Sequence, residues 1–313
     1  MEEKIYWVHL ASIEGLGGAI FDQLVRRFGS LKRALEAPLN EIQDIPGLDE
    51  RTAEAICRAG QTLDATEAKV KELTGKGVKI ITNLDAEYPG RLREATNPSP
   101  LLYQVGDLKP QDDSAVAIIG SRDCSEVSQR RAQEYAEFFA GNQVTVVSGY
   151  ATGVDINGHL GALKGEGRTL IIPGCGINKF DIGPLKDVGV SDWTNLGDKV
   201  VVISEQPPES DWMGQACTAR NRLVAAQAKA VLVMEAKLHS STLDTVSHAK
   251  KLGRPVFVQS FGTVSEKVMG NEMLRKEGAG VINTVDDLTK IVEVVRGKEE
   301  AGDLSTRGVD PRC

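Results

Sequence analysis

The chain has 313 residues, 41% hydrophobic and 26% charged, a composition typical of a soluble globular protein with room for more than one domain. No run approaches about 18 uninterrupted apolar residues and the first residues lack the apolar segment of a signal peptide, so the sequence predicts a cytoplasmic protein that does not enter a membrane. The formal net charge of −7 argues mildly against nucleic-acid binding, although a local cluster of Lys and Arg can bind phosphates on an acidic protein.

The spacing of cysteine and histidine argues against a metal site. The five cysteines lie far apart without a C-x-x-C pair, which suits ordinary thiols in a reducing compartment. The four histidines show no spacing such as H-E-x-x-H. We therefore expect no metal and no cofactor.

Residues 1–75 predict a small all-α domain of the helix-hairpin-helix or SAM-like kind. Segments 13–18 and 45–50 each place a hydrophobic–x–Gly–hydrophobic turn before an amphipathic run. The glycine of such a turn lets backbone amides face a DNA phosphate without reading the base sequence. Packing or protein contact is the alternative role of the module. The basic residues that would touch DNA, or otherwise form a solvated helix face, are Arg26, Arg27, Lys32 and Arg33.

A second domain is predicted over residues 76–297. A helix at 64–73 ends near Gly75, and an apolar strand at 78–81 follows. Residues 76–112 are an extension before the first core strand. Residues 298–313 form a polar tail that we expect to be disordered.

The stretch 115–155 predicts two consecutive strand–glycine turn–helix units. Strand 115–119 and strand 144–147 each run into a turn of small residues that opens a helix. Parallel strands end at one edge of a sheet, where a serine, N–H groups at a helix N-terminus and an arginine suit a phosphate. The candidate phosphate-binding residues of the two turns are Gly120, Ser121, Arg122, Ser148, Gly149 and Gly153.

The second half of the domain adds further strands and turns to this edge. Strands are predicted at 168–172, 200–205, 230–234 and 254–259, and an amphipathic helix at 285–295 closes the domain. The segment Arg220-Asn221-Arg222 is expected at the start of a helix, with Arg222, like Arg122, facing solvent and phosphate. The further candidate phosphate-binding residues are Gly174, Gly176, Arg220, Asn221, Arg222, Ser240, Ser241 and Thr242, with Asp155 and Glu235 in support.

The sequences of these motifs resemble those of the DNA-processing protein A family (DprA, also called Smf). The chain reads VAIIGSR at 116–122 and VVSGYATGVDINGH at 146–159, close to the family's VAIVGSR and VVSGLARGIDAAAH. Segments 85–108 and 219–224 are similar to the family's D..YP..L, PP.vLy..G.L and FP.RNR.I elements. The resemblance covers roughly residues 5 to 285 in the family's order.

The resemblance implies both a fold and a function. The fold is α/β, with a Rossmann-like, mostly parallel sheet shared by DprA and LOG-like proteins. The implied function is to bind single-stranded DNA in the pocket and to load a RecA-type recombinase during DNA uptake, transformation and homologous recombination. A homodimer is implied, and no catalytic residue.

The sequence also departs from the family's usual text. Thr152 replaces the arginine of the SGLARGID turn, so one positive charge near the pocket is missing. The proline-glycine after the sixth strand becomes Ser260-Phe261-Gly262, the YP expected near 178–181 is absent, and 184–198 looks restructured. The polar tail is too short and too hydrophilic for the C-terminal winged-helix domain that many members have, so none is expected here.

An enzyme or a nucleotide-binding protein using the same pocket is the alternative. LOG-type nucleotide phosphoribohydrolases resemble this fold and carry PGG-x-GT-x-x-E, but residues 239–246 lack the double glycine and the glutamate. The three nearby carboxylates each have a structural role that needs no substrate. We expect Asp155 to cap a helix, Glu235 to pair with a pocket arginine, and Asp244 to lie at a helix N-terminus.

Overall fold

The computed structural model describes residues 2–13, 16–60, 63–192, 196–262 and 265–297. The predicted polar tail, 298–313, lies outside the described residues.

The first part of the chain is all-α, as predicted. Trp7 of the first helix stacks on Phe21 of the second, with ring centroids 5.2 Å apart. Ser30 and Asp49 cap the third and fifth helices, because their side chains accept hydrogen bonds from backbone N–H groups of the first turn. The helices are α1 (Glu2–Ala11), α2 (Gly18–Phe28), α3 (Leu31–Glu36), α4 (Leu39–Gln43), α5 (Glu50–Ala59) and α6 (Asp64–Gly75).

Nine strands form one mixed sheet in the described part of the chain, in the order β1-β2-β6-β5-β4-β3-β7-β8-β9. The first two pair antiparallel with their neighbours and every other pairing is parallel, which confirms the mostly parallel sheet. The strands are β1 (Lys79–Thr82), β2 (Leu101–Val105), β3 (Ala115–Ile119), β4 (Thr145–Ser148), β5 (Thr169–Ile171), β6 (Val200–Ser204), β7 (Ala230–Val233), β8 (Val256–Gln259) and β9 (Gly280–Ile282).

Two of these strands, β2 and β9, are not predicted by the sequence. Strand β2 follows Pro98 and Pro100. Its sequence is matched to a family motif and is not interpreted as a strand. Strand β9 has three residues and is only half-buried at Gly280 and Val281, so it shows little apolar pattern.

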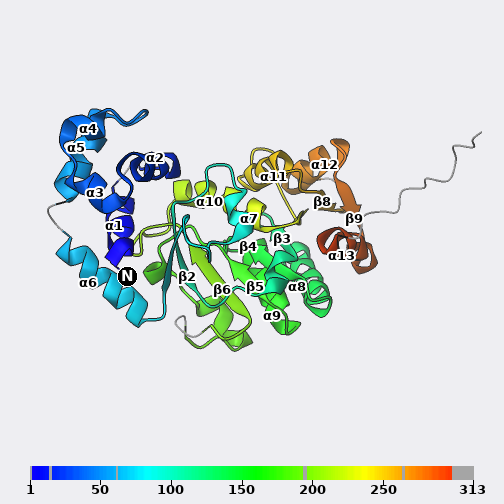
Figure 1. The fold of residues 1–313 in the computed structure, drawn as a ribbon. Helices are drawn as coiled ribbons and strands as arrows, with labels where there is room; N and C mark the ends of the chain where they lie inside the picture. Colours follow the sequence, from blue (N-terminus) through cyan, green and yellow to red (C-terminus); the bar gives the residue numbers. More distant parts are fainter. Residues whose placement is uncertain (1, 14–15, 61–62, 193–195, 263–264, 298–313) are drawn as a thin grey trace, which may run out of the picture.

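Helices cover both faces of the sheet (Figure 1). Along β3, Ala115, Ala117 and Ile119 belong to one apolar cluster, whereas Val116 and Ile118 belong to another, because successive residues face opposite sides. The first face packs on α7 (Gly90–Arg93), α10 (Gly214–Gln227), α11 (Thr242–Lys251) and α12 (Met269–Lys276). The second packs on α8 (Glu126–Gly141), α9 (Val154–Lys164) and α13 (Thr289–Arg296).

The N-terminal helices pack on the β1-β2 end of the sheet. Tyr103 and Val105 of β2 share one buried cluster with Trp7 and Phe21. Gly18, the last residue of segment 13–18, packs closely here, since a Cβ on it would come within 2.6 Å of the Pro98 carbonyl oxygen. The glycine of the hydrophobic–x–Gly–hydrophobic turn itself, Gly15, lies outside the described residues.

Short 3₁₀ turns occupy several connections. The segment that the sequence marks as restructured contains one, and its Leu185 and Val190 are buried in the same apolar cluster as residues of α9 and β6. The predicted closing helix at 285–295 begins as another and continues as α13. The turns are η1 (Pro110–Asp113), η2 (Ile177–Lys179), η3 (Gly183–Val188), η4 (Glu266–Val268) and η5 (Val285–Leu288).

The order of the strands creates a crevice beside β3. The chain runs outward from β3 through β4, β5 and β6, then returns to place β7, β8 and β9 on the other side of β3. The connection after β3 therefore leads toward β4 on one side, and the connection after β7 leads toward β8 on the other side. Open α/β sheets bind ligands at such a switch point, outside the carboxyl ends of the strands.

Membrane-spanning helices and metal-binding clusters are both missing from the described residues. None of the described helices is both long and apolar enough to span a bilayer. Across the described ranges, no group of three or more His, Cys, Asp or Glu side chains is arranged to hold a metal ion.

Candidate functional site

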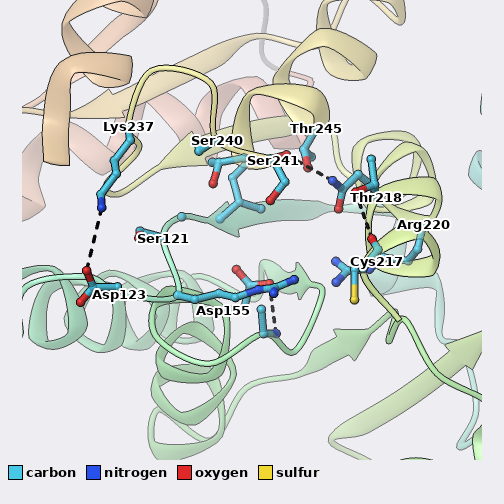
Figure 2. Close-up of a pocket in the computed structure, with 17 residues that line it drawn as sticks. Ser121, Asp123, Asp155, Cys217, Thr218, Arg220, Lys237, Ser240, Ser241 and Thr245 are labelled. Atoms are coloured by element: carbon cyan, nitrogen blue, oxygen red, sulfur yellow. Dashed lines mark hydrogen bonds and ion pairs between the residues drawn. The ribbon is translucent and has the colours of Figure 1, made fainter. Parts of the chain in front are cut away.

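A cavity of about 570 Å³ opens at the carboxyl ends of β3 and β7; we call it the switch-point cavity. Figure 2 shows Lys237 and Asp123 on one side, Cys217, Thr218 and Arg220 on the other. Its lining residues are Ile119, Gly120, Ser121, Arg122, Asp123, Ala151, Asp155, Gly214, Cys217, Thr218, Arg220, Asn221, Lys237, Ser240, Ser241, Thr242 and Thr245.

Two glycines let the turns after β3 and β4 pack directly on each other. Gly153 has a φ of 85°, and a Cβ there would lie 2.4 Å from the Ser121 carbonyl oxygen. A Cβ at Gly120 would lie 2.6 Å from a methyl carbon of Val154. These glycines therefore shape the cavity floor, and Gly153 does so without lining the cavity.

The helix that follows the first turn starts later than predicted. Helix α8 begins at Glu126 and is capped by Ser125, so its N-terminus does not directly follow Ser121. The N–H of Ser121 donates to the Glu235 carbonyl oxygen at 2.7 Å and is not available to a ligand. The expectation of a helix N-terminus and a free N–H at this serine is wrong.

Glu235 has a different partner from the one expected. Its buried carboxylate accepts hydrogen bonds from the Ser125 N–H and hydroxyl, at 3.1 and 2.7 Å, and from the Ser128 hydroxyl at 2.5 Å. The expected arginine pair is wrong, because Ser125 and Ser128 at the start of α8 occupy this carboxylate. Glu235 holds α8 to β7 beneath the cavity.

Arg220 forms the inner wall of the cavity and is only 4% exposed. Its Nη2 donates to the Gly149 carbonyl oxygen at 3.0 Å. Its Nε is buried without a hydrogen-bond partner among the residues the structure describes. Since a buried donor without a partner costs about 1–3 kcal/mol, this end of the cavity suits an anionic oxygen.

Asp155 is buried beside Arg220. Its carboxylate accepts from the N–H groups of Gly149 and Ala151, at 3.2 and 3.3 Å, so it fastens the turn that precedes α9. The expectation of an N-cap is wrong, because Asp155 lies inside the first turn of α9 and Gly153 holds the cap position. Burial raises the pKa of this carboxyl, and the Arg220 charge opposes that rise.

Arg222 lies away from the switch-point cavity. Both of its terminal nitrogens bond to Glu205, at 2.6 Å each, and the two side chains are 13% and 8% exposed. The expectations that it faces solvent, and that its segment starts a helix, are wrong: α10 begins at Gly214, so residues 220 and 222 point in different directions from mid-helix. Arg222 lines a separate cavity of about 480 Å³ near the start of α2.

The start of α11 forms the upper wall of the cavity. Ser240, Ser241 and Thr242 line it as predicted, and the Ser240 hydroxyl is buried without a partner in the described part of the chain. Asn221 supports this wall, since its Nδ2 donates to the Ser241 carbonyl oxygen at 3.2 Å. Asp244 lies in the first turn of α11, as expected.

The cavity mouth carries positive charge that the sequence identifies only in part. Arg122 is exposed, and no described residue bonds to its guanidinium. Lys237 lies 4.0 Å from the Asp123 carboxylate, which also binds Lys267 at 3.3 Å. Lys237 is not among the predicted site residues. Its position in the sequence, three residues before the predicted Ser240, could have indicated that it lies at the cavity.

The remaining predicted residues support packing rather than the cavity surface. Ser148 donates to the Ile118 carbonyl oxygen at 2.6 Å and joins β4 to β3. A Cβ at Gly174 would lie 2.5 Å from the Cys217 sulfur, and one at Gly176 would lie 2.1 Å from the Pro207 carbonyl oxygen. These glycines allow the turn after β5 to approach α10 and the turn after β6.

Residues 79–293 match the family described as DNA recombination-mediator protein A. The chain belongs to this family. It is 27% identical over 290 residues to Protein Smf of Synechocystis sp., covering 91% of this chain and 72% of that protein. It is 31% identical over 205 residues to the DNA processing protein DprA of Streptococcus pneumoniae, and the match covers 66% of this chain and 71% of that protein. The resemblance to DprA and Smf is thus confirmed.

Solved structures of recombination-mediator proteins agree with this membership. The crystal structure of DprA from Streptococcus pneumoniae aligns with a TM-score of 0.75 and 26% identity, over 91% of this chain and 97% of that one. The DNA processing protein A of Helicobacter pylori aligns with a TM-score of 0.57 and 29% identity, over 70% of this chain and 96% of that one. Its structure is described for its single-stranded DNA binding mode. The predicted Rossmann-like fold is confirmed.

Proposed function

We propose that this protein binds single-stranded DNA, with a backbone phosphate in the switch-point cavity. The observation that carries the proposal is that two groups of lining residues, Arg220 Nε on the inner wall and the Ser240 hydroxyl on the upper wall, are buried without partners in the described ranges. Arg122 and Lys237 add positive charge at the mouth. A phosphate offers acceptor oxygens to the two unpartnered donors and a negative charge to Arg122, whose guanidinium has no partner among the described residues.

The single strand, rather than a duplex, is supported by the shape of the site and by a relative. The cavity, with a volume of about 570 Å³ among the loops at the sheet edge, is too small to enclose a double helix. The Helicobacter pylori protein of this family is described as binding single-stranded DNA. The site residues that we propose for this chain are Gly120, Ser121, Arg122, Arg220, Asn221, Lys237, Ser240, Ser241 and Thr242.

Titration of a labelled single strand and its duplex at two salt concentrations tests the proposal. We expect tighter binding of the single strand and an affinity that falls as salt rises, because neutralising phosphates releases counterions. Equal affinity for both forms, or no binding at low salt, would contradict it.

We further propose a role in recombination and transformation in which the protein loads a RecA-type recombinase as a homodimer. Membership of the recombination-mediator family supports this proposal. The test is whether the protein speeds recombinase assembly on single strands coated with a single-strand-binding protein. Sedimentation of the purified protein measures its oligomeric state.

The proposal includes no chemical step. A phosphoribohydrolase needs a carboxylate at the ribose, but Glu235 is occupied by Ser125 and Ser128, and Asp155 by two backbone N–H groups. Asp244 does not line the switch-point cavity. Incubation with nucleoside monophosphates should release no free base. Turnover that is lost in Asp155→Asn, with the fold retained, would favour the nucleotide-hydrolase alternative.

A further inference from the structure

Three basic side chains gather at the amino ends of β3, β7 and β8, the edge of the sheet opposite the switch-point cavity; we call them the amino-edge cluster. Its members are Arg91, Lys229 and Arg254. Lys229 directly precedes β7, and Arg254 lies two residues before β8. Val231 pairs with Val256 in the parallel register, so residues 229 and 254 lie two positions before that pair, on neighbouring chains of the sheet edge.

Helix α7 brings Arg91 to the same place, because it is tied to the starts of both β3 and β8. Arg91 Nε donates to the carbonyl oxygen of Asp113, two residues before β3, at 3.1 Å. Glu94, the cap residue that ends α7, pairs with Arg254. Residues 91 and 94 are three positions apart and so lie on one side of the helix. Since β7 lies between β3 and β8, Lys229 meets both arginines at this edge.

The amino-edge cluster has more hydrogen-bond donors than its neighbours satisfy. The ammonium of Lys229 has no hydrogen bond or ion pair with any residue that the structure describes. Only Nε of Arg91 has a hydrogen-bond partner across the described ranges, so both terminal nitrogens are unused. The buried Nε of Arg254 also lacks a partner there. Three cations therefore face two carboxylates, those of Glu94 and Asp113, and a net positive charge remains.

The positive charges of the cluster repel one another. Burial lowers the pKa of Lys229, and the charges of Arg91 and Arg254 lower it further, while the Asp113 carboxylate opposes the fall. Burial and the charge of Arg254 likewise lower the pKa of Arg91. A bound anion relieves such repulsion, because a nearby opposite charge stabilises the protonated forms. The cluster therefore favours a ligand with negative charge and several acceptor oxygens.

We propose that the amino-edge cluster binds a phosphate group, at a site separate from the switch-point cavity. Phosphate oxygens accept hydrogen bonds from guanidinium and ammonium groups at the same time. Arg91, Lys229 and Arg254 do not line the switch-point cavity, which opens at the other ends of the strands. The site is therefore independent of the proposed DNA binding. Its phosphate belongs either to a small molecule or to a nucleic acid backbone, and the test separates these two sources.

The probe is inorganic phosphate, titrated against sodium chloride of equal ionic strength while the melting temperature is measured. A ligand of the folded state raises the melting temperature by an amount that grows with its affinity. All proteins carry Arg122→Ala, which weakens phosphate binding in the switch-point cavity. Lys229→Gln should raise the dissociation constant for phosphate about tenfold, the effect of one lost charge-assisted hydrogen bond. Lys229→Arg should keep most of the affinity, because the charge remains.

The control is Lys186→Gln, which removes an exposed lysine on η3 and should leave the affinity unchanged. The general stabilising effect of phosphate ions on folded proteins is the same in every variant and cancels in the comparison. Equal phosphate affinity before and after Lys229→Gln would overturn the site.

A second variant tests the sign of the charge effect. Asp113→Asn removes a carboxylate that competes with the anion but keeps the backbone carbonyl that Arg91 binds. It should tighten phosphate binding severalfold, whereas Asp187→Asn, which removes an exposed carboxylate on η3, should not. Unchanged or weaker binding by Asp113→Asn would contradict the site.

Titration with a single-stranded oligonucleotide, in the chain that retains Arg122, identifies the source of the phosphate. If Lys229→Gln weakens binding of both phosphate and oligonucleotide, a nucleic acid backbone occupies the cluster. If it weakens binding of phosphate alone, the ligand is a small molecule. Failure of the proposed function looks different: neither protein then binds the oligonucleotide, while phosphate still raises the melting temperature in a manner that depends on Lys229.

Discussion

The guanidinium of Arg220 lies over Gly149, so closely that a Cβ on this glycine would be 1.4 Å from Nη1. The glycine carbonyl also accepts a hydrogen bond from Arg220. The glycine therefore leaves room for the arginine, and the arginine reaches the cavity only because Gly149 has no side chain. The sequence predicts a separate phosphate contact for each residue, but in the structure one makes room for the other.

Gly149→Ala should therefore displace Arg220. We expect a loss of stability of about 1–3 kcal/mol from overpacking, together with weaker DNA binding. Chemical denaturation and strand titration measure the two effects. Gly141→Ala is the control: this glycine ends α8, no atom lies within 4 Å of the place its Cβ would take, and stability should hold or rise slightly. Full DNA binding by Gly149→Ala would show that the position of Arg220 is unimportant.

Arg122→Ala should weaken single-stranded DNA binding by about 1–3 kcal/mol, the range for a lost charged hydrogen bond. The melting temperature should barely change, because the side chain is exposed and has no partner among the described residues. Arg130→Ala is matched in charge loss, lies on α8 outside the cavity and is 69% exposed; it should bind DNA normally. Unfolding of Arg122→Ala would mean that the arginine has a structural role.

Arg222→Ala should act on stability first. Removing Arg222 leaves Glu205, 8% exposed, as an uncompensated buried charge, which costs about 3 kcal/mol or more. The double variant Arg222→Ala/Glu205→Ala should recover part of that loss. Urea denaturation of the wild-type protein, the single variant and the double variant measures the free energy of unfolding of each. A stable Arg222→Ala protein with impaired DNA binding would restore the phosphate role predicted from the sequence.

His159 should make the protein sensitive to mild acid. Burial lowers the pKa of His159 from its ordinary 6.5 to about 3, and the nearby Arg220 adds to this. Its Nδ1 bonds to the Thr169 hydroxyl at 2.6 Å, while its buried Nε2 has no partner within the described chain. Between pH 6.5 and 3 the unfolded histidine binds a proton that the folded one does not, so stability falls as pH falls.

The measurement is the free energy of unfolding at about pH 7 and about pH 5. His159 should contribute about 2 kcal/mol to the loss between these values, following the linkage slope for one proton. The loss should be smaller by that amount in His159→Gln, which cannot take up a proton. An equal loss in both proteins would contradict the assignment.

The sequence by itself determined the strands β1 and β3 to β8, the helical N-terminal part and the family. Each depends on local pattern: short buried runs followed by glycine turns, and motif text around Arg122 and Arg220. Glycine, serine and arginine at the strand ends also marked the edge of the sheet at which the switch-point cavity lies, because parallel strands share a direction.

The tertiary structure alone decided which of these residues meet. Arg220 and Arg222 are two positions apart in the sequence, but the turn of α10 sends one to the switch-point cavity and the other to Glu205. Glu235 bonds to Ser125, 110 positions away, and Trp212 and Tyr150 line one cavity only through the packing of loops. Partners that distant are chosen by the order of strands in the sheet and by packing, which no local pattern encodes.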